Sequence, residues 1–120
     1  MTENKAFMTA AYEAGRYLSL MEDALGRLEQ SLLRQDELSS LISLCMLQAD
    51  LGSMQNPQAV TMKLMELGLP VWADPSRCTD ELEAERDREF ARAEEAYREA
   101  EELSSLCEAM LNKADTSLHV

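Results

Sequence analysis

Apolar residues recur along the first part of the chain at alternating steps of four and three residues. The positions with this spacing are Phe7, Ala11, Ala14, Leu18, Met21, Leu25, Leu28 and Leu32. Such a heptad pattern is typical of a helix that packs along one seam, and no alternation of the strand type competes with it. The pattern predicts a helix from about residue 4 to about residue 50, with Gly52 suited to end it.

The pattern of this first helix slips at Gln35 and Asp36. The apolar positions resume one residue early, at Leu38, Leu41, Ile42 and Cys45. A phase slip within one helix and a short break, with Asp36 capping a new helix, both account for the change. Because no Gly or Pro lies nearby, we favour one helix over a break, and leave open whether it is kinked near Gln35.

A short helix is marked by local capping signals. Asn56 is a suitable N-cap and Pro57 a suitable first residue, and Gly68 followed by Pro70 ends the helix after about Leu67. Its apolar residues lie on most sides: Ala59, Val60, Met62, Leu64, Met65 and Leu67. This distribution favours a helix sandwiched between other elements.

The third helix begins at Asp74 and Pro75, with Thr79 as a second candidate cap, and frays after about residue 114. Its apolar positions are Leu82, Phe90, Ala93, Tyr97, Ala100, Leu103, Cys107, Met110 and Ala114. The first and third helices match in length. We therefore expect an all-α, coiled-coil-like fold over residues 1–120 as a single domain: a long antiparallel helical hairpin with the short helix at its turn and Trp72 closing that end.

Charge and cysteine usage narrow the function classes. The chain has 23 acidic and 11 basic residues, a formal net charge of −12, which disfavours direct contact with nucleic acid or with an anionic membrane. No apolar run approaches the ~20 residues that span a bilayer, and the N-terminus lacks a signal-peptide layout. Cys45, Cys78 and Cys107 are too widely spaced for a disulfide framework or a zinc ribbon. These features predict a reduced, cytoplasmic protein without membrane insertion.

Catalytic and metal-binding signatures are missing from the sequence. The only histidine is His119, so neither a di-metal carboxylate–histidine site nor a histidine-activated nucleophile is favoured. There is no glycine-rich phosphate loop. Cys45 and Cys107 fall on the apolar seams, as inert core thiols do. We expect no enzymatic activity, no cofactor and no metal.

Two features are candidates for binding another protein. Residues 57–72 are the most apolar stretch outside the seams, and their methionines suit either an adaptable surface or gap-filling in an aromatic-poor core. Two glycines 11 residues apart lie on one line of the first helix, where close approach of another helix and simple tolerance both account for them. The candidate partner-binding residues are Val60, Met62, Leu64, Met65, Leu69, Trp72, Gly15 and Gly26.

The third helix also carries many acidic residues. Arg98 lies four residues after Glu94, and Arg92 three after Glu89, on neighbouring helix turns. A solvated face with weak ion pairs is the favoured interpretation. The alternative is a nucleic-acid mimic, which the interleaved arginines disfavour because local neutralisation would weaken it.

The stretch from Ala24 to Leu51, ALGRLEQSLLRQDELSSLISLCMLQADL, resembles the first helix of small all-helical export chaperones of the flagellar and type III secretion systems. The residues that carry the resemblance are Leu28, Leu32, Leu33, Asp36, Leu38, Leu41 and Leu44. It covers about a quarter of the chain, and the long acidic third helix departs from it. The resemblance implies a cytosolic chaperone that binds secreted subunits through apolar helical grooves.

Together these features predict a non-enzymatic chaperone or adaptor that holds a partner protein's amphipathic helix. The second hypothesis is an acidic inhibitor that binds a DNA- or RNA-binding protein in place of nucleic acid. A homodimer, in which two hairpins form a four-helix bundle, is compatible with either hypothesis.

Overall fold

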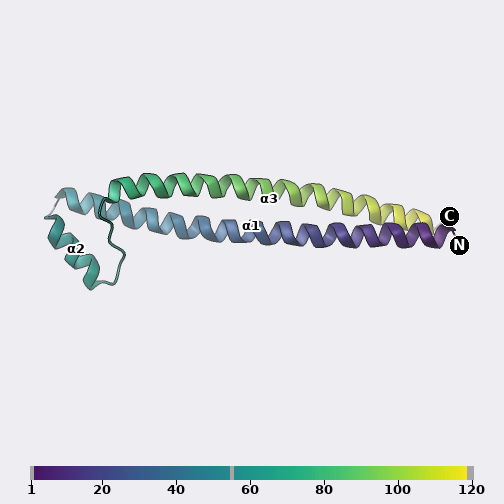
Figure 1. Cartoon of the computed structure of the whole chain (residues 1–120), viewed down its shortest axis with the longest axis horizontal. Coiled ribbons are helices and arrows are strands. Elements are labelled where there is room, and N and C mark those ends of the chain that lie inside the picture. The colour runs from purple at the N-terminus through teal and green to yellow at the C-terminus, as the bar shows by residue number, and fades with distance from the viewer. Residues whose placement is uncertain (1, 55, 119–120) are drawn as a thin grey trace. The chain divides into compact units, whose positions relative to one another are not determined.

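The computed structural model describes residues 2–54 and 56–118, and the side chains of residues 5–54 and 56–116. This part of the chain contains three helices and no strand: α1 (Thr2–Met54), α2 (Pro57–Glu66) and α3 (Pro75–Leu118) (Figure 1). The long helix α1 packs against the long helix α3, and the short α2 lies between them in the chain, so the expected all-α hairpin is confirmed.

The chain divides into two compact units, each of which contains a piece of α1 and a piece of α3. The terminal unit consists of Met1–Ser31 and Arg92–Val120, and the turn unit of Leu32–Ala91, which includes α2. Within each unit the two pieces run antiparallel.

The ends of α2 follow the expected capping chemistry. The Asn56 side chain accepts a hydrogen bond from the backbone N–H of Gln58 at 2.9 Å, which satisfies one of the unpaired donors of the first turn. At the other end Gly68 has a φ of 69°, and the N–H of Leu69 donates to the carbonyl of Leu64. This is a Schellman motif, which needs a residue that tolerates the left-handed conformation.

Helix α1 is continuous through residues 35–36, as the sequence favoured, but it ends at Met54 rather than near Gly52. Gly68 is the only residue of the described chain with a positive φ, so Gly52 does not form a left-handed cap. A glycine inside a helix costs only about 1 kcal/mol, which packing of the flanking turns offsets. Helix α3 likewise runs beyond the expected end near residue 114, to Leu118.

The seam that the sequence pattern indicated for the terminal unit is confirmed in part. Ala14, Ala93, Ala100, Cys107 and Ala114 are buried as expected, and Phe7, Met21, Leu28, Leu103 and Met110 are half-buried. The buried members of the seam are Ala10, Ala14 and Ala24 on α1, and Ala93, Ala96, Ala100, Cys107 and Ala114 on α3. Leu18, Leu25 and Tyr97, expected in the seam, are instead 43%, 44% and 53% exposed. The true seam lies one residue earlier at these positions, because facing alanines let two helices approach closely.

The seam of the turn unit removes the expected phase slip. Gln35 is itself a buried seam residue, and Leu38, Ile42 and Cys45 continue the steps of three and four from it. The side chain of Gln35 donates to the backbone carbonyl of Glu89 at 3.3 Å. The slip arose from placing Leu32 in the seam, whereas its side chain is exposed, as is that of Phe90 on α3. A polar seam residue with a hydrogen-bond partner therefore explains the pattern without a kink.

Candidate partner-binding surface

The segment between α2 and α3 is tied to α1 by one buried carboxamide. The side-chain nitrogen of Gln48 donates to the carbonyl of Trp72 at 2.9 Å, and the N–H of Trp72 donates to the side-chain oxygen of Gln48 at 3.1 Å. Gln48 is buried, so this reciprocal pair satisfies polar atoms that would otherwise be costly to bury. It fixes Trp72, which is half-buried, beside α1.

The six candidate residues of the 57–72 segment separate into supporting and exposed side chains. Val60 and Leu64, four residues apart on α2, are buried and form its inner face. Met62 and Met65 are 65% and 66% exposed. Leu69, like Trp72, is half-buried. The structure therefore leaves two methionines of the predicted set largely exposed.

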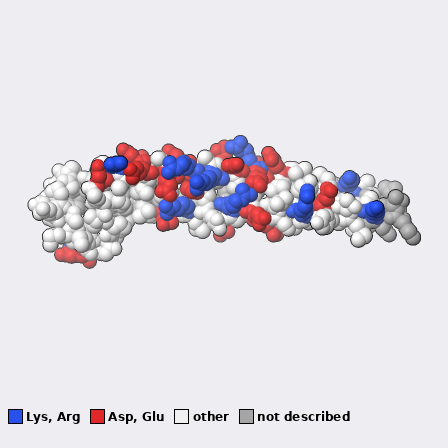
Figure 2. Space-filling model, viewed as in Figure 1, with Lys and Arg blue, Asp and Glu red and all other residues white. Residues whose placement is uncertain are grey.

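The exposed methionines belong to a larger apolar surface, which we call the apolar end. Its members, each between 48% and 78% exposed, are Met46, Leu47, Met54, Met62, Met65 and Leu67. Residues 38–73 contain only three charged residues, Asp50, Lys63 and Glu66. Figure 2 shows the resulting contrast, with an almost uncharged surface around α2. The sequence-based set of candidate residues did not include the other four members, Met46, Leu47, Met54 and Leu67. The scarcity of charged residues between positions 38 and 73 was the signal that could have identified them.

A cavity of about 270 Å³ opens where the end of α1, the start of α2 and the 72–76 segment meet. Its lining includes Gln48, Gly52, Val60, Thr61 and Trp72. None of its lining residues has a side chain that titrates near neutral pH, so the cavity offers no general acid or base. Its walls are partly polar and partly apolar.

Gly15 and Gly26, the other two candidates, lie on the α1 portion of the terminal unit. A Cβ atom built on either glycine would meet nothing within 4 Å. Close approach of another helix of the described chain is therefore not the reason for these glycines. Their use by a partner or a second copy stays a prediction.

The three cysteines are free thiols. Burial raises the pKa of Cys45, and the neighbouring Cys78 raises it further. The Cys107 thiol, also buried, donates to the carbonyl of Ala14 at 3.4 Å. The expected burial of Cys45 and Cys107 is confirmed. Among the side chains that the structure describes, no cluster of three metal-ligating residues occurs, and His119 lies outside the described residues.

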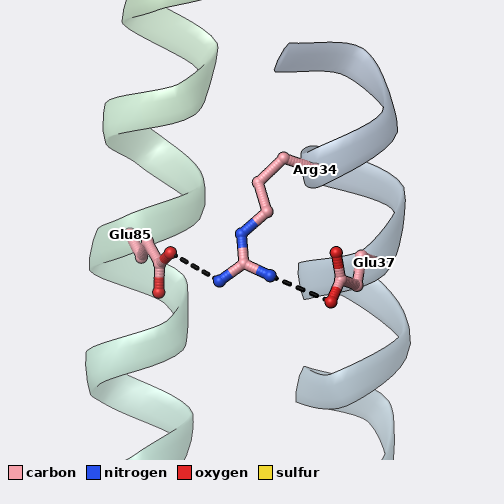
Figure 3. Close-up of polar contacts among 3 residues, drawn as sticks. All are labelled: Arg34, Glu37 and Glu85. Atoms are coloured by element: carbon pink, nitrogen blue, oxygen red, sulfur yellow. Dashed lines mark hydrogen bonds and ion pairs between the residues drawn. The ribbon is translucent and has the colours of Figure 1, made fainter. Parts of the chain in front are cut away.

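Charged side chains of the turn unit pair across the two long helices. Arg34 on α1 lies between Glu85 of α3, at 2.7 Å, and Glu37 of its own helix, at 3.0 Å (Figure 3). The hydrogen bond to Glu85, followed by that to Glu37, raises the pKa of Arg34. The network joins carboxylates to a guanidinium, as the interpretation of a salt-bridged solvated face requires.

Across the described residues, no helix combines the length and apolar character needed to cross a membrane. Comparison of the chain with protein-family models, with characterised proteins and with solved structures gave no match. The resemblance to export chaperones therefore stays a prediction.

Proposed function

We propose that the chain is a non-enzymatic chaperone or adaptor that binds an amphipathic helix of a partner protein on the apolar end. The observation that carries this proposal is the exposure of six large apolar side chains within a nearly uncharged surface. Large apolar side chains exposed within an uncharged surface favour an interaction site, because leaving apolar area in water is unfavourable.

The composition of the apolar end favours a helical, variable ligand. Four of its six members are methionines, whose unbranched thioether chains adapt to different partner shapes. Apolar side chains of a partner helix, spaced three and four residues apart, would lie across such a surface. The buried residues Val60 and Leu64 hold α2 in place and so supply the support. The resemblance to export chaperones points to the same class of ligand.

The test compares two double variants that remove equally exposed apolar side chains. Met62→Ser with Met65→Ser removes two members of the apolar end, whereas Met8→Ser with Leu33→Ser removes side chains that are 67% and 62% exposed elsewhere. A tagged chain is used to isolate partners from the native host, and the identified partner's helix is then titrated as a peptide.

We expect the first variant to weaken peptide binding about tenfold or more, because two methionine side chains would no longer bury apolar area against the peptide. The second variant should bind as the unaltered chain does. Circular dichroism should show equal helix content in both. If the first variant retains every partner at full affinity, the proposed role of the apolar end is wrong.

The acidic-mimic alternative has one observation in its favour, a column of exposed carboxylates on α3 at seven-residue spacing: Glu94, Glu101 and Glu108. Seven residues correspond to about 10.5 Å along a helix, which is wider than the charge spacing of a nucleic-acid strand. Glu94 also pairs with Arg98 at 3.6 Å. A mimic's complex should weaken steeply as salt rises, and an apolar complex much less, so a salt titration separates the two.

A further inference from the structure

The two flanks of the helix pair in the terminal unit differ in chemistry. One flank carries the ion pair between Arg27 and Glu99, whose nitrogen and oxygen lie 2.9 Å apart. Leu20 and Leu106 occupy the same heptad position, seven residues from Arg27 and Glu99 respectively. These four residues directly precede seam positions 21 and 28 on α1 and 100 and 107 on α3. In an antiparallel pair of helices, residues at this heptad position line the same flank on both helices. We call it the closed flank.

The opposite flank is lined by the residues that directly follow every second seam position, including positions 17 and 24 on α1 and 96 and 110 on α3. We call it the open flank. Its large members are Leu18, Leu25, Tyr97 and Leu111. They are 43% to 54% exposed, although they repeat at multiples of seven residues along α1 and α3. The sequence pattern placed Leu18, Leu25 and Tyr97 in the seam, and the structure leaves them exposed.

A third apolar position in each heptad has a specific meaning. Two helices that contact only each other need apolar residues at about two of seven positions, whereas a helix with two helical neighbours needs about three of seven. Around Leu18 and Leu25, α1 carries the third position, and Tyr97 and Leu111 supply it on α3. Since both helices carry it on the same flank, the open flank has the composition of a surface covered by a further helix.

Acidic side chains border the open flank on both sides. The heptad position adjacent to it, turned away from the seam, holds Glu22 and Glu29 on α1, and Glu94, Glu101 and Glu108 on α3, all exposed. This pattern decides between occupants of the flank. A second copy docked through the same flank would bring acidic borders against acidic borders, which is repulsive. A helix with basic side chains beside its apolar stripe would be attracted.

We propose that the open flank of the terminal unit binds a basic amphipathic helix from a partner protein. The 14 residue steps from Tyr97 to Leu111 span about 21 Å along α3, so four turns of the partner helix cover the flank. This inference goes beyond the proposed function, because it assigns a second surface in the other unit and the charge class of its ligand. Loss of the apolar end should leave it intact, so the two proposals fail independently.

The experiment uses the full chain and two synthetic peptides of about 18 residues, long enough for four to five helical turns. Both peptides have leucines at steps of three and four. One carries lysine at the positions beside the leucine stripe, and the other carries glutamate there. Binding is titrated by calorimetry at low and at physiological salt. We expect the lysine peptide to bind and the glutamate peptide not to bind.

Matched variants locate the binding surface. Leu18→Ser with Leu25→Ser alters the open flank, and Leu20→Ser with Leu106→Ser alters the closed flank; the four side chains are between 42% and 44% exposed. The open-flank variant should weaken lysine-peptide binding by about tenfold or more, and the closed-flank variant should bind normally. Equal affinity of the two variants would overturn the assignment.

A second matched pair tests the charge argument. Glu101→Gln with Glu108→Gln removes two bordering carboxylates, and Glu95→Gln with Glu102→Gln removes two on the outer side of the same helix. The first pair should weaken binding by about threefold and flatten its salt dependence, while the second should have less effect. Equal effects of the two pairs would show unspecific charge attraction and would refute the proposal.

A second copy of the chain is the alternative occupant of the flank. Self-association that disappears in the Leu18→Ser, Leu25→Ser variant would assign the flank to a second copy, and this outcome also refutes the proposal.

Discussion

Leu38 provides a test of where the seam of the turn unit lies. Its side chain is 0% exposed, whereas Leu33, five residues earlier on α1, is 62% exposed. Replacing each by alanine changes helix propensity by the same small amount, so this contribution cancels between the two variants. The difference between them therefore reports burial alone.

The expected magnitudes follow from these exposures. Leu38→Ala loses the full transfer free energy of the removed methyl groups and leaves a cavity, which together lower the free energy of unfolding by about 3 kcal/mol. Leu33→Ala removes a side chain of which about a third is shielded from water and leaves no cavity, so the loss is at most about 1 kcal/mol.

Urea unfolding followed by far-ultraviolet circular dichroism measures both variants. With an m-value of about 1.5 kcal/mol/M, the midpoint of Leu38→Ala should fall by about 2 M and that of Leu33→Ala by much less. The m-values should agree, because both variants unfold from the same fold. Equal midpoint shifts would refute the seam described above.

Three further predictions concern polar and ionisable groups. Gln35→Leu should raise the free energy of unfolding by about 1 kcal/mol in the same urea assay, because an apolar side chain of similar size fills the seam and the Glu89 carbonyl keeps its helical donor; a lower midpoint would show that the bond is needed. Burial holds the pKa of the folded Cys45 thiol above its ordinary value of 9.0. The unfolded thiol therefore ionises first, and stability should fall as pH rises past 9.0, a slope that Cys45→Ala should reduce; an equal slope in the variant contradicts this. Asn56→Ala should lower stability by about 1 kcal/mol and accelerate amide exchange in the first turn of α2, because the Gln58 N–H loses its acceptor; unchanged exchange would exclude a capping role.

Helix starts were predictable because their chemistry is local. The proline at 57 follows an asparagine cap, and Asp74 precedes Pro75 and accepts from the N–H of Arg77 at 3.2 Å. These signals need no information about distant parts of the chain. The helix ends were less certain, because a glycine ends a helix in this way only where it adopts the left-handed conformation, which Gly68 does and Gly52 does not.

The phase of the seam was not predictable from α1 alone. Two sets of seam positions on α1 share Phe7, Ala14, Met21 and Leu28 and differ by one residue at the steps between, where the set with more leucines is the wrong one. The choice depends on α3, whose small residues Ala93, Ala96 and Ala100 pack well against other small residues. Likewise, the apolar residues of α2 surround the helix, so the pattern could not separate the buried Val60 and Leu64 from the exposed methionines.

The alanine seam of the terminal unit bears on how long the chain survives among proteases. An alanine side chain removes little apolar area from water, so each alanine of the seam contributes less free energy of unfolding than a buried leucine would. Degradation of a marginally stable protein follows the population of its opened state. A ligand that binds only the folded form, at a hundred times its Kd, adds about 2.7 kcal/mol and lowers that population about a hundredfold. A partner helix on this unit would therefore set the lifetime of the chain, and the two proteins would rise and fall together in abundance.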